Sequence, residues 1–142
     1  MDRLGLPRKA VVTPGNRYDS PFLPELIRGL RPKDVIGDAA HDAESNRKAC
    51  SEIGAKPHIA TNPRRSGKRR YTPPLCKRKR YIVEQLNSRF KEMLGECWLR
   101  FKGLAKKTTS VYSALLAMNA LAIQALLTNR PELLRKVGVY RY

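Results

Sequence analysis

The sequence predicts an α/β protein with one hydrophobic core. Its 142 residues suit a single domain, because one core commonly serves roughly 100–200 residues. Over residues 8–61, short runs rich in β-branched side chains alternate with runs whose apolar residues recur at the helical interval. The order strand, helix, strand, helix, strand is typical of a sheet flanked by helices. The longest apolar stretch, residues 114–127, is shorter than the ~20 residues of a membrane-spanning helix, which predicts a buried helix.

The first strand and the first helix are expected near the N-terminus. An Ala-Val-Val run within residues 8–13 predicts a strand, and the Pro-Gly-Asn sequence after it predicts a turn. Asp19 or Ser20 can cap a helix that extends to Leu30, where an Arg-Pro pair ends it.

A second strand, a helix and a third strand are expected next. Residues 34–38 have an apolar centre and a terminal acid, which is typical of a buried strand that opens into a loop. This strand is expected to deliver Asp38 to an edge of the sheet. Residues 42–53 predict a helix, Gly54 suits a left-handed cap after it, and residues 56–61 predict a strand.

A basic segment follows these elements. Residues 62–74 have the Pro, Gly and Ser composition of a loop, and residues 64–80 hold nine Lys or Arg and no acid. A solvated linker could have this composition. Contact with nucleic acid is favoured, because the segment leads directly into a helix that carries a lone carboxylate.

That helix is predicted over residues 77–100. Arg80, Glu84, Asn87 and Lys91 fall on one narrow polar stripe of it. Polar stripes are usually solvent faces, so the stripe by itself indicates no function. The apolar arc that is expected to face the core comprises Ile82, Val83, Leu86, Phe90, Met93, Leu94 and Cys97.

The last predicted element is a strongly apolar helix. Gly103 interrupts the preceding pattern, and residues 108–110 offer a cap for a helix that ends at Leu127. This helix is apolar nearly all round, so other elements are expected to cover it. A basic and aromatic tail follows at residues 129–142, and the sequence suggests no task for it.

The charge of the chain indicates a polyanionic partner. Lys and Arg number 29 against 12 Asp and Glu, for a net charge of +17. Nucleic acid is the expected partner, because neutralised phosphates release counterions, and a membrane surface is the weaker alternative. Residues 1–9 lack the apolar run of a secretory signal, so we expect a cytoplasmic, nucleoid-associated protein. Three widely spaced cysteines and two histidines indicate neither a disulfide framework nor a zinc site.

Two blocks of residues resemble the DDE transposases of bacterial and archaeal insertion sequences. The opening from Asp2, with the Val-Thr-Pro-Gly and Asp-Ser sequences after it, is similar to the block in which the first catalytic Asp ends a strand. Asp38, with Ala-Ala-His-Asp and then Asn-Arg after it, resembles the block of the second catalytic Asp. The family often has Tyr where this chain has His41.

A third block strengthens the resemblance. Arg80, Glu84 and Lys91 match the family pattern Tyr-(2)-Arg-(3)-Glu-(6)-Lys in residue type and spacing, although Lys77 occupies the place of the Tyr. The two cations lie one and two helical turns from the Glu on the same face. A phosphate near this carboxylate can therefore contact both of them.

The resemblance implies a ribonuclease-H-like mixed sheet flanked by helices, and a DNA transposase that cuts and joins insertion-sequence DNA. Asp2, Asp38 and Glu84 are implied as catalytic residues that hold two Mg²⁺ (or Mn²⁺) ions, since hard oxygen ligands select hard cations. One ion would activate water or a 3′-hydroxyl, and the other would stabilise the leaving oxygen of an in-line displacement. DNA contacts are expected from Arg80, Lys91, Asn87, Arg64, Arg65, Lys68, Arg69, Arg70, Lys77, Arg78 and Lys79.

The resemblance also implies a domain organisation. Residues 1–128 would form a partial catalytic domain with the basic loop 62–80 inside it, followed by the tail at residues 129–142. The family's first Asp lies on a central strand, so that strand is expected to be missing or a stub here. We therefore expect a truncated or split transposase with weak or no activity alone. Its expected partners are element-end and target DNA, and a second copy or a separate N-terminal transposase fragment.

Two alternatives stay open. A noncatalytic basic nucleic-acid-binding protein, ribosome-associated or architectural, would explain the charge equally well but would leave the acids unexplained. Another ribonuclease-H-like nuclease or resolvase would use the same metal chemistry on a different DNA, and only the spacing of the third block argues against it.

Overall fold

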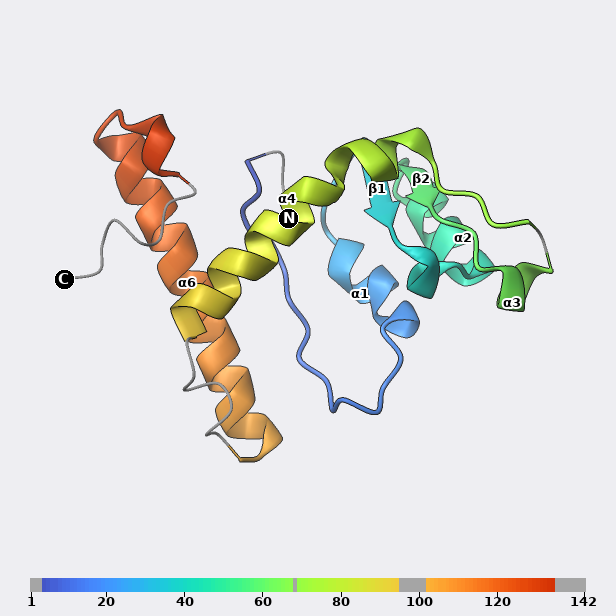
Figure 1. Ribbon diagram of the computed structural model, residues 1–142, viewed down its shortest axis with the longest axis horizontal. Coiled ribbons are helices and arrows are strands. Elements are labelled where there is room, and N and C mark those ends of the chain that lie inside the picture. Colours follow the sequence, from blue (N-terminus) through green and yellow to red (C-terminus); the bar gives the residue numbers. More distant parts are fainter. Residues whose placement is uncertain (1–3, 68, 95–101, 135–142) are drawn as a thin grey trace. The chain divides into compact units, whose positions relative to one another are not determined.

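The computed structural model describes residues 4–67, 69–94 and 102–134, which belong to two compact units (Figure 1). One unit is Gly15–Arg80, and the other joins Met1–Pro14 to Tyr81–Tyr142. Three residues with predicted roles, Asp2, Lys68 and Cys97, lie outside the described residues, as does the tail from residue 135.

The Gly15–Arg80 unit is built on two parallel strands, β1 (Asp34–Gly37) and β2 (Lys56–Ile59). Helix α2 (Glu44–Glu52) connects them, as parallel strands require a crossover (Figure 1). This arrangement is compatible with the predicted α/β class. Within the described residues the sheet has two strands, so the larger ribonuclease-H-like sheet stays a prediction.

A small apolar core stabilises this unit. Helix α1 (Leu23–Ile27), which follows a 3₁₀ turn at Ser20–Phe22, packs against α2. The helix predicted to reach Leu30 ends earlier, because the backbone is extended at Arg28 and left-handed at Gly29, where φ is +75°. The buried side chains of the core come from Leu23, Ile27, Val35, Cys50, Ala55 and Ile59.

The region between the two strands departs from its prediction at two points. A 3₁₀ turn at Ala39–His41 precedes α2, so the helix begins at Glu44 rather than at residue 42. The helix stops before Gly54, whose φ of +72° confirms the predicted left-handed position. The strand expected to be buried has only one buried residue, Val35, whereas Ile36 on the opposite face is 41% exposed.

The basic segment contains a short helix where only loop was predicted. Helix α3 (Pro63–Ser66) starts where the Asn62 side chain accepts a hydrogen bond from the Arg64 amide at 3.1 Å. It ends at Gly67, which has a φ of +63°. The Asn-Pro pair at the start is therefore a helix signal. It was not recognised because the Pro, Gly and Ser composition of the segment predicted a loop.

The long helices of the chain are α4 (Pro74–Leu94) and α6 (Leu104–Leu127). Helix α4 begins three residues before the predicted start, because Pro is well tolerated in a first helical turn. Helix α6 begins directly after Gly103, which confirms that glycine as a break, but four residues before the predicted cap at Thr108. Residues 105–107 are Ala and Lys, which favour helix and extend it toward the glycine.

The predicted strand at residues 8–13 is wrong, because this segment is irregular throughout. Side chains of α4 and α6 bind the carbonyl groups of the N-terminal segment: Arg89 Nη2 donates to Gly5 O at 2.8 Å, and Asn119 Nδ2 donates to Pro7 O at 3.2 Å. The Tyr112 hydroxyl donates to Ala10 O at 2.9 Å. Side chains of the helices thus donate hydrogen bonds to backbone carbonyl groups of residues 5–10, a role that a neighbouring strand would have in a sheet.

Helix α4 only partly follows its predicted apolar arc. Ile82 is buried, and Leu86, Phe90 and Met93 are half-buried. Val83 was expected in the core but is 42% exposed, and Arg89 is 7% exposed although it was not expected there. The buried guanidinium is tolerated because it donates to two carbonyls, Gly5 O and Gln85 O.

Helix α6 was expected to be covered, and this is only half correct. Its buried side chains are Val111, Ala114, Met118, Ala122 and Ala125. On other faces Leu116 is 70% exposed and Leu127 is 82% exposed. By length and composition alone, α6 could cross a membrane, although the apolar stretch at residues 114–127 was predicted to be too short to do so. Core helices of soluble proteins can have the same length and composition.

Candidate active site

Asp38 lies immediately after β1, where the sequence placed it. Its Oδ1 atom accepts a hydrogen bond from the Ala40 amide at 3.0 Å and thereby caps the 3₁₀ turn at Ala39–His41. The side chain is exposed. A capping role is thus observed, and it leaves the carboxylate accessible from solvent.

The backbone of the turn after Asp38 accepts hydrogen bonds from the side chains of three residues. The Asn62 side chain donates to Ala39 O at 3.4 Å, and Arg65 donates to Ala40 O at 3.3 Å. From α2, Asn46 Nδ2 donates to His41 O at 2.9 Å. Three consecutive carbonyl groups therefore each accept a side-chain hydrogen bond.

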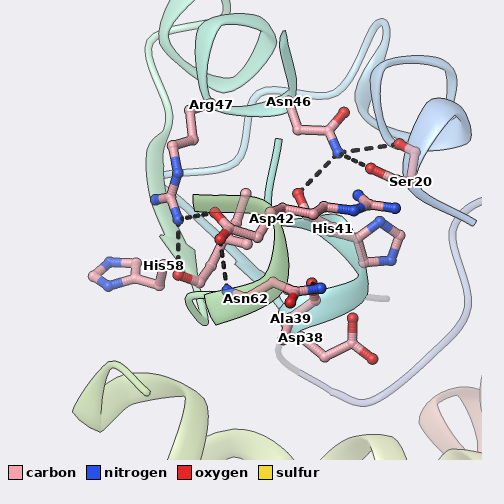
Figure 2. Close-up of polar contacts among 12 residues, drawn as sticks. Ser20, Asp38, Ala39, His41, Asp42, Asn46, Arg47, His58 and Asn62 are labelled. Atoms are coloured by element: carbon pink, nitrogen blue, oxygen red, sulfur yellow. Dashed lines mark hydrogen bonds and ion pairs between the residues drawn. The ribbon is translucent and has the colours of Figure 1, made fainter. Parts of the chain in front are cut away.

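Asp42 ties the end of this turn to the end of β2. Its Oδ1 atom accepts from Arg47 Nη2 at 2.8 Å, and its Oδ2 atom accepts from the Asn62 amide at 2.6 Å (Figure 2). Arg47 also donates to Ile59 O at 3.2 Å. Asp42 is 8% exposed, so a buried carboxylate is satisfied by a guanidinium and a backbone amide.

Asn46 is a further buried polar residue in this network. It is 1% exposed, and its Nδ2 atom lies 3.0 Å from both the carbonyl and the hydroxyl oxygens of Ser20. The first helix of the unit is thereby linked to the turn after Asp38. The sequence placed Asp42 and Asn46 within the second block but did not show that they are buried, because polar residues in a helix usually face solvent.

The polar stripe of α4 is exposed, as predicted. Arg80, Glu84, Asn87 and Lys91 all have exposed side chains. Glu84 thus presents a carboxylate to solvent on a regular helix, with basic residues at neighbouring turns. This arrangement places positively charged residues on the same helix face as the Glu84 carboxylate.

The basic segment is likewise accessible. Within this segment, the basic side chain of Arg65 donates to Ala40 O in the turn after Asp38 at 3.3 Å. The exposed basic residues are Arg64, Arg65, Arg69, Arg70, Lys77, Arg78, Lys79 and Arg80, whereas Lys68 lies outside the described residues.

The predicted metal site has the right donor chemistry. Asp38 and Glu84 are exposed carboxylates, and hard oxygen donors of this kind are the ligands that Mg²⁺ and Mn²⁺ prefer. They belong to different compact units, and Asp2 lies outside the described residues. Over residues 4–67, 69–94 and 102–134, no group of three His, Cys, Asp or Glu side chains could hold a metal ion. The convergence of the three acids therefore stays a prediction.

The two cysteines in the described part of the chain are free thiols, of which Cys50 is buried and Cys76 is half-buried. Burial raises the pKa of Cys50, although the positive charge of Arg47 opposes the shift. Burial also raises the pKa of Cys76, whose thiol donates to His58 O at 2.9 Å. Raised pKa values make nucleophilic thiolates scarce at neutral pH, as expected for structural thiols.

Comparison with known proteins identifies the family. The Transposase DDE domain matches residues 1–120, which is most of the chain, so the protein belongs to the DDE transposase family. A relative from Brucella ovis carries the name of a transposase for insertion sequence element IS6501 and is 40% identical over 68 residues. This match covers 46% of the present chain and 52% of the relative, so the chain spans about half of the relative's length. No solved structure matches the chain.

Proposed function

We propose that this chain supplies metal-binding and DNA-binding residues for cutting and joining insertion-sequence DNA. The observation that carries the proposal is the exposed Asp38 carboxylate at the end of β1, in a chain of the DDE transposase family. Asp38, Glu84 and Asp2 are the proposed ligands of divalent metal. Bound Mg²⁺ would supply an activated oxygen nucleophile and stabilisation of the leaving oxygen.

The chain's own residues would orient the DNA strand. Arg80 and Lys91 flank Glu84 on the exposed stripe and would bind phosphates of the DNA. Asn87 lies between these two cations on the stripe and would form hydrogen bonds with the DNA. The exposed arginines and lysines of residues 64–79 would extend this contact along the backbone. Arg65 is well placed for such a role, because it is fixed to the turn that follows Asp38.

Metal binding by the full chain tests the proposal. The Mn²⁺ affinities of the parent, Asp38→Asn and Glu84→Gln are compared by calorimetry, with Asp34→Asn and Glu92→Gln as matched controls on the same strand and the same helix. We expect a loss of about tenfold or more for the site variants, because a neutral amide is a poor ligand for a hard cation. Equal affinities in all five proteins would contradict the metal site.

Nucleic-acid binding without catalysis is a second candidate, favoured by the net charge of +17 and by the exposed basic segment. It predicts that DNA affinity depends on Arg64 and Arg65 while Glu84→Gln has no effect on any metal-dependent property. Absence of Mn²⁺ binding together with strongly salt-dependent DNA binding would favour this candidate.

A further inference from the structure

We propose that Asp42 is a positioning residue for Asp38: its carboxylate clamps the turn after Asp38 to the end of β2. The inference rests on the proposed function, because it gives Asp38 its metal-binding role. The clamp itself rests on the observed contacts. Asp42 would contact neither metal nor DNA and would act through the backbone of the turn.

The geometry of the clamp is reciprocal. The Asp42 carboxylate accepts from the Asn62 amide at 2.6 Å, and the Asn62 side chain donates back to Ala39 O at 3.4 Å. These two bonds join both ends of the turn to the residue that directly precedes α3. Asn62 therefore links the turn to the start of α3.

Arg47 closes the clamp from the helix side. The same Nη2 atom donates to Asp42 Oδ1 at 2.8 Å and to Ile59 O at 3.2 Å. This atom thereby joins the turn to the last residue of β2. Charge-assisted bonds of this length are stronger than neutral ones, so they favour the observed conformation of the turn.

The clamped turn also restricts the movement of Asp38. Its Oδ1 atom is bonded to the Ala40 amide, and Ala40 lies inside the clamped turn. The His41 amide donates to Asp38 O at 3.2 Å, which fixes the backbone of Asp38 as well. A carboxylate held in this way loses less conformational freedom when it binds a cation.

The clamp also fixes a basic residue. Arg65 donates to Ala40 O at 3.3 Å, and its helix α3 starts at the Asn62 cap. Asp42 thus helps to define where Arg65 lies relative to Asp38. Asp42 would thereby hold the proposed phosphate-binding Arg65 and the proposed metal-binding Asp38 in a fixed arrangement.

Amide hydrogen exchange of the full chain tests the clamp without metal or DNA. In Asp42→Ala and Asp42→Asn, the amides of Ala40, His41, Ala43 and Asn62 should exchange about tenfold faster or more. The Ala55 amide in the core, which donates to Cys50 O at 2.9 Å, should stay within about twofold of the parent. The matched control is Asp34→Asn, at the other end of β1. This substitution removes the carboxylate that pairs with His58 and lies outside the clamp. This control should leave the turn amides unchanged.

Several outcomes would overturn the inference. Unchanged exchange of the turn amides in Asp42→Asn would show that the carboxylate holds nothing. Equal acceleration of the Ala55 amide would show a general loss of stability instead of a local clamp. If both Asp42 variants fail to fold, Asn62→Ala keeps the amide that donates to Asp42 but removes the return bond to Ala39 together with the side-chain cap of α3. Unchanged exchange of the turn amides in that variant would reject the clamp.

A second measurement separates positioning from structure. In Asp42→Asn we expect Mn²⁺ affinity to fall by about tenfold while DNA affinity stays within about twofold, because the exposed basic side chains are retained. An unchanged Mn²⁺ affinity in a variant with accelerated turn exchange would reject the positioning role. Absence of Mn²⁺ binding in the parent would instead reject the proposed metal site, and the exchange result would still decide whether the clamp exists.

Discussion

The two compact units are stabilised in different ways. The Gly15–Arg80 unit has a continuous apolar core and a polar network that links its turns to its strands. In the other unit, side chains of the long helices bind backbone carbonyls of residues 5–10, while several apolar side chains of α6 are exposed. One unit is therefore organised mainly by contacts between nearby segments, and the other by contacts between segments far apart in the sequence.

The largest expected effect sharpens the contrast within α6 itself. Met118 is 3% exposed and Leu116 is 70% exposed, although both are apolar residues of one helix. Met118→Ala should lower the free energy of unfolding by about 2–4 kcal/mol through lost burial and a cavity, whereas Leu116→Ala should change it by less than about 0.5 kcal/mol. Urea denaturation measures both, and similar losses would refute the exposed position of Leu116.

A second pair of variants compares the hydrogen bonds of the two units. Asn46→Ala should cost about 2–3 kcal/mol, because the Ser20 and His41 carbonyls lose a buried donor. Asn119→Ala removes one half-buried bond to Pro7 O and should cost about 1 kcal/mol. Thermal or chemical unfolding gives both values, and the reverse order would indicate that the polar network is weaker than the helix contacts.

Alkaline pH should weaken the Gly15–Arg80 unit. Burial raises the pKa values of Cys50 and Cys76 above the ordinary 9.0, so the folded state retains thiol protons that the unfolded chain releases. This contribution to stability is complete below pH 9.0 and is lost as the pH rises through the folded-state values. In Cys50→Ala and Cys76→Ala chains, the decline measured by urea denaturation should be smaller. A decline of the same size would assign it to other groups.

The smallest expected effect concerns His41. Its Nδ1 atom is buried and has no hydrogen-bond partner among the described residues. Replacement by Phe keeps a ring but removes that atom, so the free energy of unfolding should stay equal or rise by up to about 1 kcal/mol. A loss of more than about 1 kcal/mol in chemical denaturation would show that the imidazole makes a contact that Phe cannot replace.

Local signals in the sequence located several elements correctly. Val35 and its neighbours formed the predicted strand, and Gly54 and Gly103 mark helix boundaries because glycine accepts a positive φ. The position of Asp38 after its strand was also predictable. These features depend on residues close in sequence, and the pattern of side chains therefore carries the information.

Features that depend on distant contacts were not predictable. Residues 8–13 have strand-like composition, but their surroundings in the folded unit are helix side chains. Arg89 is buried because Gly5, far away in sequence, offers its carbonyl. The clamp formed by Asp42 and Asn62 was missed for the same reason: no periodicity indicates that a polar residue will find a partner twenty positions away. Whether Asp38 and Glu84 share a cation stays a prediction.

The exposed leucines and isoleucine of α6 have a consequence for handling the protein. Leu116, Ile123 and Leu127 present apolar surface to water, and salting-out anions such as sulfate strengthen the association of such surfaces. The same salts weaken the attraction between lysine or arginine and phosphate. Sulfate should therefore act in opposite directions on the two behaviours, because it weakens DNA binding and favours association of these apolar surfaces.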